Sequence, residues 1–238
     1  MSRANVRIEG RRSPPGPLAG ALAVGVLGAA VGWALLPSAL APRRALAAAA
    51  HGCPTPAAAS RASVALGAAK RRYLTEAQGT VIHTDLRQIA SDSILLTALS
   101  TGNLNSALAE ANRQLVRHVV QIEVLRGSRL LVDANSTSFD VGGSAVQLPA
   151  RSGRSLGQLR ITVQDVIGFI KLVHKLNAAD VVVRSAGGQL RTSLPAAATT
   201  PLPRSGCTQI GAHTYVVRSF NEASFSGEPL TIWVLTAA

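Results

Sequence analysis

One stretch of the sequence has the spacing of a hydrolytic nucleophile. Gly153-Arg154-Ser155-Leu156-Gly157 matches the pattern G-x-S-x-G. Asp165 or Asp180 and then His213 follow it in the order that such enzymes use. A nucleophile elbow needs a buried strand before the serine and a helix after it. Here a polar, glycine-rich loop precedes the serine and an alternating strand pattern follows it. We therefore interpret the match as accidental and keep an exported hydrolase only as a remote alternative.

The spacing of the other reactive side chains gives no support to metal or cofactor chemistry. The histidines follow no metal-ligand pattern; they are His51, His83, His118, His174 and His213. Two cysteines are too few for a zinc framework, and the sequence has no phosphate-binding loop or dinucleotide motif. The sequence therefore predicts no catalytic residue, no metal and no cofactor, and we expect that the protein is not an enzyme.

Four side chains of the C-terminal half could instead hold a small ligand. His174 falls on a predicted helix, whereas Arg184 and Arg218 fall on predicted strands. Tyr215 alternates with Val217 on the last predicted hairpin. A buried arginine needs an anionic or hydrogen-bonding partner, so these residues would hold an anionic ligand if they face a cavity. The alternative is that they are ordinary half-exposed residues of a helix flank and of outward strand faces.

An apolar run near the N-terminus, residues 18–41, determines on which side of a membrane the rest of the chain lies. No charged residue occurs from Ser13 through Pro42. At ~1.5 Å per helical residue the run reaches ~36 Å, enough to cross a ~30 Å hydrocarbon core. More arginines precede it than follow it, which is a mild positive-inside bias. The sequence therefore predicts one transmembrane helix over 18–41 in the plasma membrane, a cytoplasmic basic segment over 1–17 and an extracytoplasmic remainder.

Two other outcomes for this segment stay open. A cleaved secretory signal would fit the basic start and the A-x-A-like triplets Ala39-Leu40-Ala41 and Ala45-Leu46-Ala47. The run is, however, longer than the usual ~7–15 apolar residues of a signal peptide. Cys53 follows a sequence faintly like a lipidation site, although His51 departs from that pattern. Each outcome exports the rest of the chain, either anchored or secreted.

After a small-residue linker over 42–59, residues 60–238 are long enough for one or at most two compact units. Their core must be aliphatic, because aromatic residues make up only 3% of the chain. The net charge of +12 indicates affinity for anionic ligands, envelope polymers or lipid head groups, or simply an arginine-rich composition. We expect no nucleic acid partner, because no basic motif with interleaved aromatic residues appears.

Helical periodicity dominates the first part of this domain. The first helix covers 60–90, with a candidate break at Gly79. The residues expected to pack share one face of it and are Val64, Ala68, Leu74, Val81, Leu86 and Ile89. A shorter helix over 93–99 is capped by Ser91-Asp92. Another begins at Asn103 or Asn105 and runs through Arg117, with its apolar face formed by Leu104, Leu108, Ala111 and Leu115.

A period of two then indicates strands. Residues 118–124 and 130–134 form a hairpin in which Gly127 takes the first central position of a type II′ turn, which needs positive φ. A polar loop over 135–155 leads to a third strand with Leu159, Ile161 and Val163 on one face. Asp165 caps the next helix, 165–177. The remaining elements are a strand over 180–185, a short strand near Leu190, a proline-rich loop over 195–212, and a final hairpin over 213–220 and 230–235.

This order of elements resembles the Cache (PAS-like) extracytoplasmic sensor domains over residues 60–238. LRQIASDSILLTALSTGNLNSALAEANRQL is similar to the helical lead-in of that family, HVVQIEVLRGSRLLVDA to its first hairpin, and LGQLRITVQDVIGFIKL to its strand that runs into a helix. The resemblance implies an α+β fold with a long N-terminal helix, a five-stranded antiparallel sheet with helices on one side, and a small-molecule cavity against the sheet. The chain departs from the family by stopping at Ala238, so a partner protein would carry any signal.

The sequence thus favours a membrane-anchored extracytoplasmic sensor-like domain that binds a small ligand. The alternative is a ligand-free structural or interaction module of the cell envelope. A cavity lined by polar groups would favour the sensor, and a filled, dry core with an exposed apolar patch would favour the module.

Both cysteines lie beyond the membrane run, in loops rich in proline or glycine, where an oxidising compartment would preserve a disulfide. We therefore predict a Cys53–Cys207 bond that ties the start of the long helix to the loop before the last hairpin. Two separate thiols are the alternative.

Overall fold

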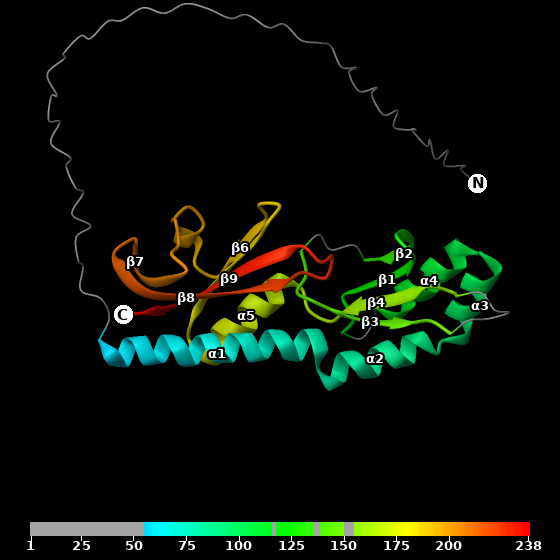
Figure 1. Cartoon of the computed structure of the whole chain (residues 1–238), viewed down its shortest axis with the longest axis horizontal. Helices are drawn as coiled ribbons and strands as arrows, with labels where there is room; N and C mark the ends of the chain where they lie inside the picture. The colour runs from blue at the N-terminus through cyan, green and yellow to red at the C-terminus, as the bar shows by residue number, and fades with distance from the viewer. Residues whose placement is uncertain (1–54, 116–117, 136–138, 150–154) are drawn as a thin grey trace, which may run out of the picture. The chain divides into compact units, whose positions relative to one another are not determined.

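The computed structural model of the chain describes residues 55–115, 118–135, 139–149 and 155–238 (Figure 1). The predicted cytoplasmic segment, the predicted transmembrane helix over 18–41 and Cys53 lie outside these ranges. Within the described ranges, no helix is both long and apolar enough to cross a membrane. The chain divides into residues 1–48 and 49–238, and all the elements described here belong to the second unit.

Four helices open this unit, and polar side chains fix where the third and fourth begin. The helices are α1 (Pro56–Gln78), α2 (Thr80–Ala90), α3 (Ser93–Thr101) and α4 (Leu104–Gln114). Asp92 accepts a hydrogen bond from Leu95 N at 2.7 Å, and Asn103 accepts one from Ser106 N at 3.1 Å. Each cap satisfies a backbone donor that the first turn would leave without a partner. Both caps confirm the sequence prediction.

The predicted break at Gly79 is also confirmed. The Gly79 N–H donates to Thr75 O at 2.9 Å. A Cβ at this position would lie 2.3 Å from the same oxygen, so any larger residue would force the two helices apart. Glycine therefore ends α1 and lets α2 start one residue later (Figure 1).

The first sheet follows the helices and has four antiparallel strands. They are β1 (Gln121–Arg126), β2 (Arg129–Ala134), β3 (Ser144–Gln147) and β4 (Gln158–Thr162), in the spatial order β2-β1-β4-β3. Gly127 has a φ of 62°, as the predicted hairpin turn requires. The sequence missed β3, which falls in the region predicted to be a polar loop. Four residues are too few to give a clear period of two.

The second sheet has five antiparallel strands and is preceded by helix α5 (Val166–Asn177). The strands are β5 (Asp180–Ser185), β6 (Leu190–Thr192), β7 (Ser205–Ile210), β8 (His213–Ala223) and β9 (Pro229–Ala237), in the order β6-β5-β9-β8-β7. Asp165 caps α5 as predicted, since its side chain accepts from Gly168 N at 2.6 Å. The sequence predicts a loop over 195–212, but residues 205–210 at the end of that range form strand β7. Residues of β7 are small and polar, and they form an edge strand with no apolar alternation to reveal it.

The fold is therefore α+β with antiparallel sheets and a long N-terminal helix, as predicted, but it has two sheets where the resemblance implied one. In each sheet the first strand pairs with the second strand and with the last one. Periodicity identifies strands but not their partners, so the sequence could not assign the two hairpins to different sheets. We call residues 80–162 the first module, and α5 together with the second sheet the second module.

The face of α1 that packs differs from the predicted one. Val64 is 67% exposed and Leu74 is 39% exposed, while Val81 on α2 is 59% exposed. The buried face of α1 instead carries small residues and one tyrosine: Ala58, Ala62, Ala65, Ala69, Tyr73 and Ala77. Small side chains allow a close approach, and α1 packs on β8 and β9 (Figure 1). The same error places Leu108 on the packed face of α4, although it is 37% exposed.

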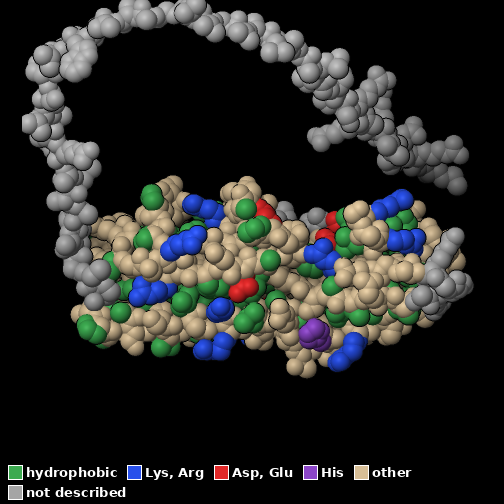
Figure 2. Space-filling view, viewed as in Figure 1, with side chains coloured by type: hydrophobic (Ala, Val, Ile, Leu, Met, Phe, Trp, Pro, Cys, Tyr) green, Lys and Arg blue, Asp and Glu red, His purple; other side chains and the backbone are tan. Residues whose placement is uncertain are grey.

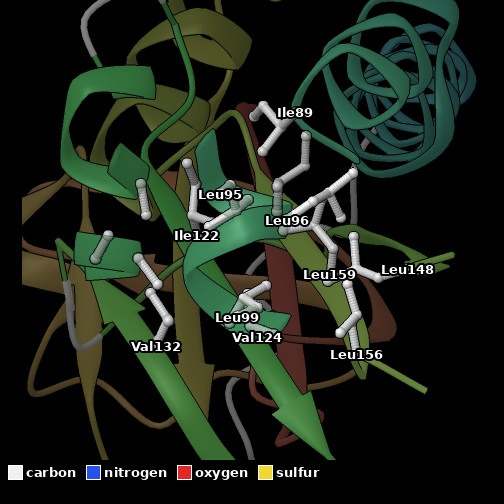
Figure 3. Close-up of a cluster of buried hydrophobic side chains, with 14 of the residues drawn as sticks. Ile89, Leu95, Leu96, Leu99, Ile122, Val124, Val132, Leu148, Leu156 and Leu159 are labelled. Carbon is white, nitrogen blue, oxygen red and sulfur yellow. The ribbon is translucent and has the colours of Figure 1, made fainter. Parts of the chain in front are cut away.

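Helices α2, α3 and α4 cover one face of the first sheet with an aliphatic core (Figure 3). The best-buried side chains of this core share an exposure of 5% or less; among them are Leu95, Leu96, Leu99, Ile122, Val124 and Leu159. Leu95, Leu96 and Leu99 come from α3, whereas Ile122 and Val124 come from β1 and Leu159 comes from β4. This face of the first sheet, one place where the resemblance would put a ligand, is packed with side chains.

The second sheet is covered on both faces. Helices α1 and α5 cover the face that carries Val181, Ile232 and Val234, and Phe169 of α5 is fully buried there. The opposite face carries Val182, Val217 and Leu235 and is covered by the connection from β6 to β7, which includes the short 3-10 helix η1 (Pro195–Ala197).

Tyr73 of α1 joins the two modules. Its hydroxyl donates to Ala223 O in the second module and accepts from Gly142 N in the first at 2.8 Å. Burial raises the pKa of Tyr73 to about 12, because an ionised phenolate would be poorly solvated here. Beside it, Arg160 of β4 donates to Phe225 O and lies 4.8 Å from the centroid of the Phe225 ring. The hairpin between β8 and β9 is thus fixed against the first module.

Candidate functional site

A cavity of 310 Å³ lies between α5 and the edge strand β6. Its walls combine two isoleucines, three basic side chains and two hydroxyls: Ile167, Ile170, Lys171, His174, Arg191, Thr192 and Ser193. The amphipathic pattern of α5 places Phe169 and Val173 in the core and leaves its flank, including the 46%-exposed Ile167, at the cavity. Because β6 is only three residues long and pairs with β5 alone, it leaves this side of the sheet open beside α5.

Asp180 holds the polar end of this cavity in place. Its Oδ1 accepts a hydrogen bond from Ser193 Oγ at 2.9 Å and lies 3.3 Å from His174 Nδ1. Ser193 Oγ in turn accepts from Val181 N at 2.9 Å, and His174 Nδ1 lies 3.2 Å from Ala179 O. The imidazole and the hydroxyl are therefore each fixed by more than one contact. Fixed polar groups can recognise a ligand without a large loss of side-chain freedom.

The charge of the cavity favours an anion. Lys171 and Arg191 are exposed cations, none of the seven lining residues is acidic, and the neighbouring Asp180 carboxylate is already bonded to Ser193 and lies against His174. The Arg191 guanidinium lies 5.9 Å from the centroid of the Phe139 ring, and its Nη1 donates to Leu190 O at 2.9 Å.

The two hydroxyls of the cavity already donate, Thr192 to Leu194 O and Ser193 to Asp180. Arginine and lysine are therefore the groups suited to carboxylate or phosphate oxygens, while Ile167 and Ile170 provide an apolar wall. The arrangement can therefore accommodate a small organic anion.

The same residues are not arranged as a catalytic triad. In a triad the histidine lies between the carboxylate and the serine, so that it can take the serine proton. Here the carboxylate of Asp180 lies between Ser193 and His174, and the Ser193 hydroxyl donates its hydrogen bond to Asp180. At the G-x-S-x-G stretch, Ser155 leads into strand β4 rather than into a helix, which is opposite to a nucleophile elbow.

The four predicted site residues do not come together. His174 lines the cavity with its side chain 55% exposed. Arg184 points from the opposite face of the sheet, where its Cζ lies 5.8 Å from the centroid of the Trp233 ring, and Tyr215 packs on that same face. Arg218 is half-buried, and its register opposite Val234 puts it on the face under α1. Alternation along each strand therefore separates the two arginines.

The sequence missed Lys171, Arg191 and Ser193 as site residues. Lys171 could have been found, because it lies three positions before His174 and so shares a helix face with it. Arg191 and Ser193 gave no such signal, since nothing in the sequence shows that β6 lies beside α5. Cys207 lies half-buried on β7, and its predicted partner Cys53 is outside the described residues, so the disulfide stays a prediction.

On the face shown in Figure 2, the basic side chains do not form one continuous stripe. Lysine and arginine are spread over that face, among polar and apolar side chains. This distribution fits an arginine-rich composition better than a binding surface for a long polyanion.

Three solved structures are similar to this chain. The extracellular domain of a histidine kinase, vpHK1S-Z8, has a TM-score of 0.44 and 14% identity, over 76% of this chain and 91% of that one. The sensor domain of the Vibrio cholerae histidine kinase DctB has a TM-score of 0.38 and 12% identity, over 76% and 95%. The ligand-binding domain of the Pseudomonas fluorescens chemoreceptor CtaA, solved with L-alanine, has a TM-score of 0.34 and 12% identity, over 76% and 94%.

These neighbours are sensor and ligand-binding domains of histidine kinases and chemoreceptors. No family model matches the chain, and no curated protein matches it. With TM-scores below 0.5, the similarities do not assign a ligand or a family, so membership of the Cache family stays a prediction.

Proposed function

We propose that residues 60–238 form a sensor-like domain that binds a small organic anion in the cavity between α5 and β6. The observation that carries the proposal is the composition of that cavity: Lys171 and Arg191 without a lining carboxylate, beside hydroxyls and an isoleucine wall. In this proposal the domain is extracytoplasmic and anchored by residues 18–41, with a linker that ends before α1 begins at Pro56, four residues earlier than the sequence predicts. It is not an enzyme, and it passes its signal through a partner protein.

The test is a thermal-shift screen of the full chain with small anions. Acetate, succinate and phosphate are the first probes. L-Alanine and GABA, which are zwitterions with no net charge at neutral pH, are included for comparison, because CtaA was solved with the former and the Pseudomonas aeruginosa chemoreceptor PctC with the latter. A ligand that binds only the folded form stabilises it by ~2.7 kcal/mol at a hundred times its Kd.

Charge-reversal variants locate the binding site. Lys171→Glu and Arg191→Glu should each remove the shift, because each replaces an attractive charge with a repulsive one. Arg184→Glu is the matched control, since Arg184 is an exposed strand arginine on the opposite face of the sheet. The proposal fails if no anion shifts the wild-type melting temperature, or if Arg184→Glu removes the shift as fully as Arg191→Glu.

A second function, a ligand-free interaction module, is favoured by one observation. The helix-covered face of the first sheet is packed with aliphatic side chains. Two large apolar side chains of the same module are exposed to solvent, Leu130 at 46% and Ile94 at 51%. A first module that only docks another envelope protein would need a packed core and an apolar surface. Failure of every anion in the screen would leave this as the better account of the whole domain.

A further inference from the structure

A second and larger cavity lies at the other end of α5. It has a volume of 780 Å³ and is bounded by the start of α1, the last turn of α5 and the end of β9. The side chains that determine its chemistry are Arg61, Val64, Lys175, Leu176 and Thr236. It shares no lining residue with the cavity between α5 and β6.

The rim of this cavity is basic. Arg61 projects from α1 and Lys175 from α5, and both are exposed. No aspartate or glutamate side chain is among the lining residues, but Ala238 is one of them, and its main-chain carboxylate is an acidic group beside which a bound anion must fit. Two cations from separate helices therefore face one opening, and an anionic group there would meet both of them.

The rim also carries the two most exposed large apolar side chains reported for the described residues. Val64 is 67% exposed and Leu176 is 62% exposed. Each comes from the same helix as one of the cations. A bound aliphatic chain would remove these side chains from water, and the burial of apolar surface stabilises a complex.

Thr236 gives an independent sign of a missing partner. It is 7% exposed, and its Oγ1 has no hydrogen-bond partner among the residues that the structure describes. Alternation along β9 puts its side chain on the same face as Val234 and Ile232, the face that α1 and α5 cover. A buried hydroxyl without a partner is unfavourable, and an oxygen of a bound anion would supply one once a rotation of the Thr236 side chain exposes Oγ1, which is itself buried.

We propose that this cavity binds an amphiphile with one anionic group, a carboxylate or a phosphate, and an aliphatic chain. The anionic group lies between Arg61 and Lys175 with Thr236 as a hydrogen-bond donor. The chain packs against Val64 and Leu176. A free fatty acid and the acyl end of an anionic phospholipid share this chemistry.

The probe is octanoate, titrated by calorimetry into the full chain held in phosphatidylcholine nanodiscs, with empty nanodiscs subtracted. We expect saturable binding to the wild type. The variant that carries both Arg61→Glu and Lys175→Glu should bind at least about tenfold more weakly, equivalent to ~1.4 kcal/mol. Arg184→Glu, which lies outside the linings of both cavities, should leave octanoate binding unchanged. Octyltrimethylammonium, which has the same chain and the opposite charge, should not bind.

Thr236→Val separates a ligand contact from a structural role. It removes the hydroxyl without a partner and keeps the volume, so it should raise the melting temperature of the ligand-free protein. The same change should weaken octanoate binding several-fold. Nanodiscs that contain phosphatidylglycerol identify the source: competition with octanoate indicates a bilayer lipid, and no competition indicates a soluble fatty acid.

The proposal is overturned if octanoate does not bind, if the double charge reversal leaves its affinity unchanged, or if the ammonium probe binds equally well. Because the double variant and this probe differ from those of the anion screen, either site can fail while the other stands.

Discussion

The two modules share a strand order and differ in what fills the space beside their sheets. In both, the first strand pairs with the second and with the last strand. The first module fills one face of its sheet with leucines from α3 (Figure 3), whereas the second has α5 beside a three-residue edge strand and a basic cavity between them. The same pairing of the first, second and last strands therefore allows an open basic cavity beside a packed sheet in one module but not at the corresponding helix-covered face of the other.

The largest effect should come from opening the packed core. Leu95→Ala removes a side chain with 0% exposure and should reduce the free energy of unfolding by ~2–5 kcal/mol, measured by urea denaturation. Its neighbour Ile94 lies on the same helix and is 51% exposed, so Ile94→Ala is the control and should change stability by ~0.5 kcal/mol or less. Equal effects of the two variants would mean that the first module is not packed as described.

A smaller effect should follow from cutting the connection between the modules. Tyr73→Phe keeps the ring but leaves Gly142 N and Ala223 O without their hydroxyl partner, which should cost ~1–3 kcal/mol. The pKa of Tyr73 is raised to about 12 in the folded protein, above its ordinary value of ~10. The wild type should therefore lose stability as the pH rises from ~10 to about 12, because the unfolded chain releases this proton first.

The control for that pH dependence is Tyr73→Phe itself. It lacks the titrating group, so the stability difference between wild type and variant should shrink over the same pH range. A constant difference would show that the Tyr73 hydroxyl is not held in a buried junction.

The smallest effects come from two matched helix caps. Asp92→Ala removes the cap of α3 in the first module, and Asp165→Ala removes the cap of α5 in the second. Each should cost ~1 kcal/mol of stability. Only Asp165→Ala should also weaken anion binding in the thermal-shift screen, because α5 carries Lys171 and His174. An equal loss of binding in both variants would remove the distinction between the modules.

Much of this fold could be predicted because local chemistry decides it. The caps at Asp92, Asn103 and Asp165, the break at Gly79 and the positive φ of Gly127 are all set within a few residues. The packed face of α1 was missed because alanines form it, and alanine gives a weak apolar signal beside Val64 and Leu74. Large apolar residues therefore marked the wrong face of the longest helix.

The candidate site could be predicted only in part, because it depends on pairing between distant segments. His174 was identified from its place on the helix, and Lys171 follows from the same face. Arg191 and Ser193 reach the cavity through the pairing of β6 with β5, which no local pattern shows. Arg184 and Arg218 were grouped as strand arginines, but the sheet register places them on opposite faces.

Hydrogen exchange tests most directly the central claim that the second module is the one that binds an anion. The full chain is compared with and without an anion that raises its melting temperature, and amide protection is read for each element. We expect added protection in α5 (Val166–Asn177) and in the strands beside it, β5 and β6, with no change in α3 or β1. Protection that appears in α3 and β1, with α5 and β6 unchanged, would contradict the account.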